Sequence, residues 1–135
     1  MFSHVTIGTH DLSRAMKFYD AALAPLGITR VQGTKYVTWA AWRRGDDVAV
    51  LWVGKPFNGQ PASNGNGWMA AIAARSRAEV DEAYAAALAA GGTDEGAPGP
   101  RPQFAADYYG AYVRDPDGNK LHFVMRRNQQ GLSPE

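Results

Sequence analysis

The spacing of apolar residues changes several times along the first half of the chain, and each change predicts an element boundary. Residues 2–8 form a short run rich in β-branched residues, which is typical of a strand. Between Leu12 and Leu23 apolar residues recur at helical spacing, and Asp11 stands where an N-cap residue is expected. Pro25 and Gly27 should end this helix. Three strand-like runs follow, at residues 28–32, 35–43 and 47–53.

The second half begins with the same order of elements. Residues 68–74 are predicted to form a strand. Ser76 and Glu79 have the spacing of a capping box at the start of an alanine-rich helix, which Gly91 and Gly92 should terminate. Both halves are therefore expected to open with a strand followed by a helix.

Glycine and proline are frequent after the second helix. Residues 93–97 are predicted to form a weak strand, and the rest of the segment to residue 106 a flexible loop that is a candidate lid. Two further strand-like runs, 109–114 and 120–126, flank Asp115–Asn119, whose residue types suit a tight turn. The second half therefore ends in a hairpin.

An internal repeat relates the two halves. Shifting the chain on itself by 65 positions superposes the two helices without a gap. The identical pairs are Tyr19 and Tyr84, Ala21 and Ala86, Ala22 and Ala87, Leu23 and Leu88, Ala24 and Ala89, and Gly27 and Gly92. The same shift places His4 on Met69. The repeat indicates a duplicated module that kept its scaffold and changed a candidate functional residue.

The length of 135 residues suits one compact domain in which two modules share a core. We expect a single domain over residues 1–135, with a first module at about 1–54 and a second at about 67–127. A linker rich in glycine, proline and asparagine joins them at about 55–66, and a frayed tail is expected at 128–135.

Composition restricts the partners and the location. The chain has no cysteine, no apolar run long enough to span a membrane and no signal-peptide pattern at its start, so we expect a cytoplasmic protein. Fourteen basic and thirteen acidic residues leave a formal net charge of +1 without a run of like charges. This balance argues against nucleic acid as the partner, and no membrane partner is expected.

Several segments together resemble the vicinal oxygen chelate superfamily, which includes glyoxalases, extradiol dioxygenases and bleomycin-resistance proteins. The segments that carry the resemblance are His4–Ile7 with Asp11-Leu12 and Phe18-Tyr19, the strand after Gly67 with the helix containing Val80 and its end at Gly91-Gly92, and Tyr109–Asn119. The resemblance implies an α+β fold in which two βαβββ modules curl into a half-barrel around a cavity. It also implies a divalent metal in that cavity.

The resemblance assigns the metal ligands position by position. His4 occupies the first-strand ligand position, Met69 the matching position of the second module, and His122 the position on the last strand where the family usually has glutamate. A fourth family position falls near Val50 or Leu51, neither of which coordinates a cation. We therefore assign His4 and His122 as candidate ligands of Zn, Fe, Mn or Ni. The set is incomplete, and a protein without metal is an equal alternative.

Further residues suit either a contact with a ligand or a structural role. The candidate ligand-binding residues are His4, Met69, Arg101, Tyr109 and His122. Four arginines are candidates for holding an anionic group: Arg43, Arg75, Arg101 and Arg114. Arg101 lies in the candidate lid and is the preferred one. Met69 is interpreted mainly as a side chain that fills the core. The abundant tryptophan and tyrosine residues suit either core packing or the lining of an apolar cavity.

Three classes of function follow, and the catalytic residues stay unassigned. The favoured interpretation is a family protein that binds a small molecule in the half-barrel cavity, with an eroded metal site. One alternative is a metal-dependent enzyme of the lactoylglutathione lyase or extradiol dioxygenase type. Another is a metal-free protein that sequesters an antibiotic or uses a histidine or tyrosine as an acid or base. A homodimer is expected because paired modules expose sheet edges and apolar faces.

Overall fold

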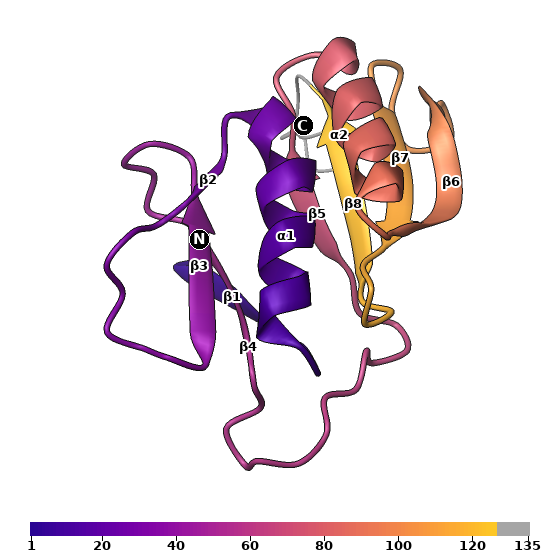
Figure 1. Cartoon of the computed structure of the whole chain (residues 1–135). Helices are drawn as coiled ribbons and strands as arrows, with labels where there is room; N and C mark the ends of the chain where they lie inside the picture. Colours follow the sequence, from indigo (N-terminus) through magenta and orange to yellow (C-terminus); the bar gives the residue numbers. More distant parts are fainter. Residues whose placement is uncertain (127–135) are drawn as a thin grey trace.

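The structure is a computed structural model, and it describes residues 1–126. Its first half contains one α-helix, one short 3₁₀ helix and four strands (Figure 1). These elements are β1 (His4–Gly8), α1 (Leu12–Leu23), η1 (Ala24–Leu26), β2 (Thr29–Arg30), β3 (Trp39–Arg43) and β4 (Val50–Gly54). Residues 55–69 then connect the modules without a helix or a strand.

The second half repeats the arrangement. Its elements are β5 (Ala70–Ala73), α2 (Arg77–Ala89), β6 (Thr93–Pro100), β7 (Tyr109–Arg114) and β8 (Lys120–Met125). Each half forms its own four-stranded sheet, in the order β1-β4-β3-β2 and β5-β8-β7-β6. In each sheet the first strand is parallel to the last strand of its module, and the other pairs are antiparallel. The two predicted βαβββ modules are confirmed.

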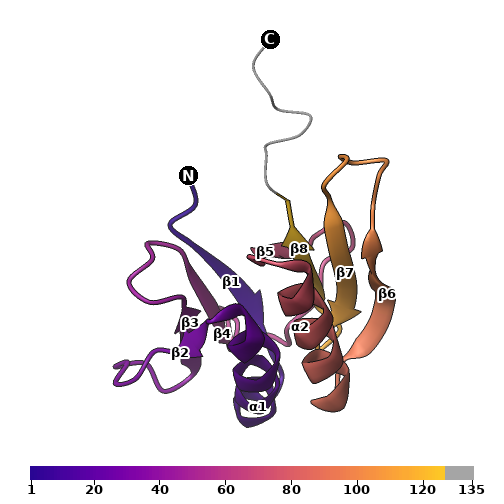
Figure 2. The same cartoon turned by 90° about the horizontal axis from the view of Figure 1, so that it is seen from above.

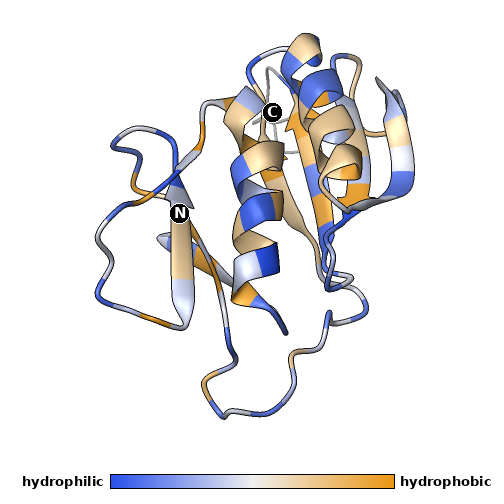
Figure 3. Ribbon diagram, viewed as in Figure 1, coloured by the Kyte–Doolittle hydropathy of each residue, from blue (hydrophilic) through white to orange (hydrophobic). Residues whose placement is uncertain are grey.

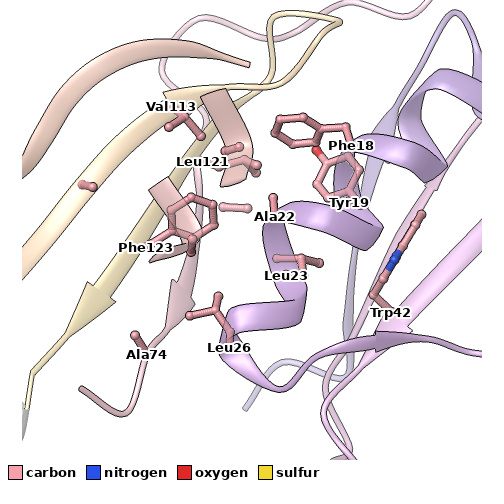
Figure 4. Packing of buried hydrophobic residues seen from close by; sticks show 14 of the residues in the cluster. Phe18, Tyr19, Ala22, Leu23, Leu26, Trp42, Ala74, Val113, Leu121 and Phe123 are labelled. Carbon is pink, nitrogen blue, oxygen red and sulfur yellow. The ribbon is translucent and has the colours of Figure 1, made fainter. Parts of the chain in front are cut away.

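The two helices lie together between the sheets, α1 against the first and α2 against the second (Figure 2). Both helices show bands of hydrophilic and hydrophobic residues, as expected where one face is buried (Figure 3). Each sheet therefore has one face covered by helices and one face without a helix, here called its open face. The modules share one core, in which Leu23 and Leu26 of the first module approach Phe123 of the second (Figure 4).

Both predicted N-caps are present. The Asp11 carboxylate accepts a hydrogen bond from the Arg14 amide at 3.0 Å, and the Ser76 hydroxyl accepts one from the Glu79 amide at 3.1 Å. The capping box differs from the expected form in one respect: the Glu79 carboxylate accepts from the Arg75 amide at 2.9 Å, one residue before the cap. The Arg75 guanidinium also pairs with this carboxylate, which explains the displacement.

Several of the predicted strands have different lengths in the structure; the run 28–32, for example, forms a strand only at Thr29–Arg30. The predicted strand 35–43 is ordered as a strand only from Trp39, because Trp39 pairs with Gly54 and continuing the ladder would place Pro56, which has no amide proton, opposite Val37. The predicted strand 93–97 instead continues to Pro100. The register shifts between Gly96 and Gly99 accommodate the glycines and prolines on this edge strand.

The bounds predicted for the loop after residue 97 are therefore partly wrong: residues 98–100 belong to β6, and residues 101–108 form the loop between β6 and β7. The role of this loop as a lid stays a prediction. The predicted tight turn is confirmed, since Gly118 adopts a φ of 89° within Asp115–Asn119. Within residues 1–126, no helix is both long and apolar enough to cross a membrane. The predicted frayed tail, 128–135, lies outside the described residues.

Candidate functional site

A cavity of about 720 Å³ lies between the modules and receives side chains from both. His4 on β1 and Met69 before β5 line it together. These two residues occupy equivalent positions of the repeat, so the duplication itself brings them to one cavity. The volume falls in the range of pockets for small organic ligands.

Small side chains on β5 leave room for this cavity. The strand consists of Ala70–Ala73 with a single larger residue, Ile72, and all four residues line the space. Met69 and Trp68 are 39% and 44% exposed, although both are large and apolar. The interpretation of Met69 as a core residue is therefore wrong. A preceding loop and a strand of small residues hold its side chain at the mouth of the cavity rather than in the packed interior.

The charged side chains at the cavity are Arg43, Arg44 and Asp47. The Arg44 guanidinium donates to the carbonyls of Leu26 at 2.9 Å and Ala73 at 2.7 Å, so it links the two modules. Asp47 lies in the exposed turn before β4. Arg43 is different, because its Nε is buried and makes no hydrogen bond with any residue from 1 to 126. A buried guanidinium N–H without an acceptor is costly.

His122 occupies a separate cluster on the open face of the second sheet. Its ring lies parallel to the Tyr112 ring at 4.0 Å between centroids and is fully buried. The Ala111 carbonyl can only accept, so the His122 Nδ1 donates to it at 3.0 Å. In the neutral ring Nε2 then accepts from the Tyr108 hydroxyl at 2.8 Å. Both ring nitrogens of His122 are thereby satisfied.

The surroundings keep the His122 ring neutral. Burial lowers the pKa of His122 below its ordinary value, and the positive charges of Arg101 and Lys120 lower it further, while the hydrogen bond with Ala111 opposes them. Burial also raises the pKa of Tyr108. Gly110 makes room for the ring, since a Cβ there would lie 2.4 Å from the His122 Cε1. The raised pKa of Tyr108 and the lowered pKa of His122 both favour the neutral hydrogen-bonded pair over transfer of the phenol proton to the imidazole.

The other two predicted ligand contacts have structural partners. Arg101 donates to the carbonyls of Ala97, Gly99 and Pro100, so its guanidinium braces the end of β6. It also lies 5.7 Å from the centre of the Tyr112 ring. The Tyr109 hydroxyl donates to Asp81 of α2 at 2.7 Å, on the helix side of the sheet. Tyr109 is thus away from both the cavity and His122.

The turn Asp115–Asn119 ties the last hairpin to the first module. The buried Asp115 carboxylate accepts from the Tyr19 hydroxyl at 2.6 Å, and the Asn119 amide donates to the Gly8 carbonyl at 2.9 Å. Burial raises the pKa of Asp115 even though these donors act against it. The structural role expected for Asp115 and for Asp117, which pairs with Arg14, is confirmed.

Comparison with known proteins decides the family. Residues 1–123 match the family model of the glyoxalase/bleomycin resistance protein/dioxygenase superfamily. The chain belongs to this superfamily. A glyoxalase/bleomycin resistance protein from Albidiferax ferrireducens is similar in sequence and structure, with 42% identity and a TM-score of 0.82 over 94% of this chain and 99% of that one. The resemblance inferred from the motifs is confirmed.

Two further solved structures show the same fold. A glyoxalase-related enzyme from Fulvimarina pelagi has a TM-score of 0.72 at 19% identity, over 93% of this chain and 88% of that one. A glyoxalase I variant from Zea mays has a TM-score of 0.68 at 26% identity, over 90% of this chain but only 44% of the other. No curated protein sequence matches the chain significantly.

The metal that this superfamily implies does not fit the residues in this arrangement. His4 is on the first sheet with its Nδ1 hydrogen-bonded to Ser3 at 2.8 Å, whereas His122 is on the second sheet and does not line the cavity. The Nε2 lone pair of His122 is occupied by Tyr108. No group of three or more histidine, cysteine or acidic residues in positions 1–126 is arranged to hold a metal. The superfamily fold is thus present without its expected donor set.

Sequence reasoning missed two residues that define these sites. Tyr108 is one of many aromatic residues in the sequence, yet it is the hydrogen-bond partner of His122. Arg44 is predicted by the sequence only as part of a turn, although it bridges the modules at the cavity. Neither residue has a local sequence signal, because each partner comes from a distant part of the chain. The small residue Gly110 in a strand was a usable signal for a bulky neighbour.

Proposed function

We propose that this superfamily member binds a small, mainly apolar organic molecule in the cavity between its modules. The cavity itself is the observation that supports this, because it combines about 720 Å³ with apolar walls and few polar groups. His4 and Met69 would contact the ligand, with Trp68 at the mouth. A cytoplasmic location is part of the proposal because a chain without cysteine suits a reducing compartment.

The neutral fluorescent probe N-phenyl-1-naphthylamine tests the cavity. Its fluorescence should rise on binding, and at 100 times its dissociation constant it should stabilise the fold by about 2.7 kcal/mol. The Ala71→Trp variant places a large ring on an exposed wall residue of the cavity and should weaken binding at least about tenfold. The matched control is Ala106→Trp, in the exposed β6–β7 loop, which should bind like the original protein.

Equal binding by the original protein and Ala71→Trp would show that the probe uses another surface and would overturn the proposal. Titration with Zn²⁺, Fe²⁺, Mn²⁺ and Ni²⁺, followed by elemental analysis, addresses the metal-dependent alternatives. Stoichiometric metal that is lost in both His4→Ala and His122→Ala would favour a metalloenzyme. Retention of cavity binding in the presence of chelator would favour the metal-free binding protein.

We also propose that the chain forms a homodimer. Several large apolar side chains are exposed outside the shared core, and exposed apolar side chains that gather in one patch are typical of protein interfaces. They include Tyr36, Val37, Val48, Trp68 and Phe104. Covering the open faces of the sheets with a second copy would bury such side chains. Light scattering of the purified protein should give twice the mass of 14.6 kDa.

A further inference from the structure

We propose that the ligand of the inter-module cavity is an organic anion, an aromatic or alicyclic carboxylate, and that Arg43 is the residue that selects it. This inference rests on the proposed function and names its ligand class. It starts from an anomaly of the first sheet, where an arginine side chain reaches the cavity without a partner of its own.

The register places Arg43 on the open face of the first sheet. Trp42 pairs with Leu51 and points into the core, so Arg43 stands opposite Val50 and points the other way. Val50 in turn pairs with His4. One row across three strands therefore carries a guanidinium, an isopropyl group and an imidazole, and all three residues line the cavity. An apolar centre with a cationic end suits an apolar molecule that has an anionic group at one end.

The hydrogen bonding of Arg43 is incomplete. Its Nε is shielded from solvent and has no acceptor within residues 1–126, and its side chain is in no ion pair of that part of the chain. The arginines Arg14, Arg30, Arg75 and Arg114 by contrast each pair with a carboxylate. A carboxylate bound in the cavity would accept with two oxygens from the terminal Nη groups of Arg43, which make no hydrogen bond or ion pair with residues 1–126.

The local charge favours an anion. Arg43 and Arg44 are positive and Asp47 is the one acidic residue that lines the cavity in the described part of the chain. Asp47 lies in an exposed turn, and its Oδ1 accepts from the Ala49 amide at 3.5 Å. Arg44 already donates to two carbonyls. Arg43 is thus the cation with free capacity, and aromatic walls from Trp68 and Phe2 suit a flat ring beside it.

Calorimetric titration with three probes of the same ring tests the inference: 2-naphthoate, neutral 2-naphthalenemethanol and cationic 2-naphthylmethylammonium. We expect 2-naphthoate to bind about tenfold or more tightly than the alcohol, as a charge-assisted hydrogen bond predicts. Arg43→Met, which keeps the apolar stem, should abolish this preference and leave the affinity for the alcohol within about twofold. Arg43→Lys keeps the charge without the planar fork and should retain only part of the preference.

Lys17→Met is the matched control, since it removes one positive charge from the exposed surface of α1 and should leave the preference intact. If the naphthoate and the alcohol bind equally well, or Arg43→Met keeps the preference, the cavity binds ligands but Arg43 does not select anions, and the inference is wrong. Preference for the ammonium probe would also overturn it and assign the main role to Asp47. If no probe binds, the cavity proposal fails and this inference fails with it.

Discussion

Single residues at the two sites differ in how completely their polar groups are satisfied. His122 is buried with both nitrogens hydrogen-bonded, and Gly110 leaves the space for its ring. Arg43 has a buried donor without an acceptor. A buried group whose hydrogen bonds are all made stabilises one arrangement of the fold. A guanidinium whose N–H groups lack acceptors can still form hydrogen bonds with a bound anion. For this reason we place the ligand at Arg43. His122 is instead assigned a structural role as a neutral ring that is hydrogen-bonded within the fold.

The stability of the protein should fall below neutral pH because of His122. Its pKa is lowered in the folded protein, so between that pKa and the unfolded value of about 6.5 only the unfolded chain binds the proton. The stabilising contribution is complete above pH 6.5 and is lost as the pH falls through the folded pKa, at up to about 1.4 kcal/mol per pH unit. Urea unfolding between pH 5 and 8 measures this slope.

His122→Gln should lose this part of the slope, while His4→Gln, at an exposed histidine, should keep it. An unchanged slope in His122→Gln would mean that His122 is protonated equally in the folded and unfolded states. Nitrogen-15 NMR of the ring supplies an independent check, because a neutral ring with the proton on Nδ1 has a characteristic pair of shifts.

Each helix is stabilised both by a hydrogen bond at its N-terminus and by the side chains of its buried face. α2 begins at Ser76, whose hydroxyl accepts from the Glu79 amide, and its buried side chains are Val80, Ala83 and Ala87. Because two of these three are alanines, the helix buries little apolar area for its length. The cap therefore matters more for α2 than for α1, which buries Phe18, Tyr19 and Leu23.

Ser76→Ala should destabilise the protein by about 1 kcal/mol, because the Glu79 amide loses its acceptor. Ser13→Ala is the control: this serine is exposed inside α1, and its replacement should change stability by less than about 0.5 kcal/mol. Urea denaturation at pH 7 compares the two. Equal losses of stability in the two variants would indicate that the hydrogen bond of the Ser76 hydroxyl does not stabilise the helix.

For the whole molecule, the shared core joins the two modules into one folding unit. Leu26 is fully buried between α1, α2 and the second sheet, and the Arg44 guanidinium adds hydrogen bonds across the same boundary (Figure 4). The Asp115–Asn119 turn makes a further link to the first module through Tyr19 and Gly8. Neither module has a separate core, so neither is expected to unfold alone.

Leu26→Ala should cost about 2–5 kcal/mol and leave a single cooperative transition. Tryptophan fluorescence reports mainly on the first module, through Trp39, Trp42 and Trp52, while amide exchange in β8 reports on the second. Both probes should give the same midpoint. Val48→Ala, at a side chain that is 78% exposed, is the control and should have little effect. Two separate transitions would show that the modules are independent.

Local sequence patterns were sufficient to predict the modules, the caps, the final turn and the superfamily. These depend on local rules: the period of apolar residues, Asp11 and Ser76 before helices, and Gly118 at positive φ. It also identified His4 and Met69 as equivalent positions of a repeat, which the structure places at one cavity.

Which polar groups have partners became known from the fold and not from the chain pattern. The sequence favoured Arg101 as the partner of an anion, yet three carbonyls engage its guanidinium, whereas Arg43 has a buried N–H without an acceptor in residues 1–126. His122 was paired with His4 by family position, yet its partners are Tyr108 and Ala111. Whether a buried polar group has a hydrogen-bond partner depends on atoms that the fold brings together from distant parts of the chain. No local sequence pattern encodes this.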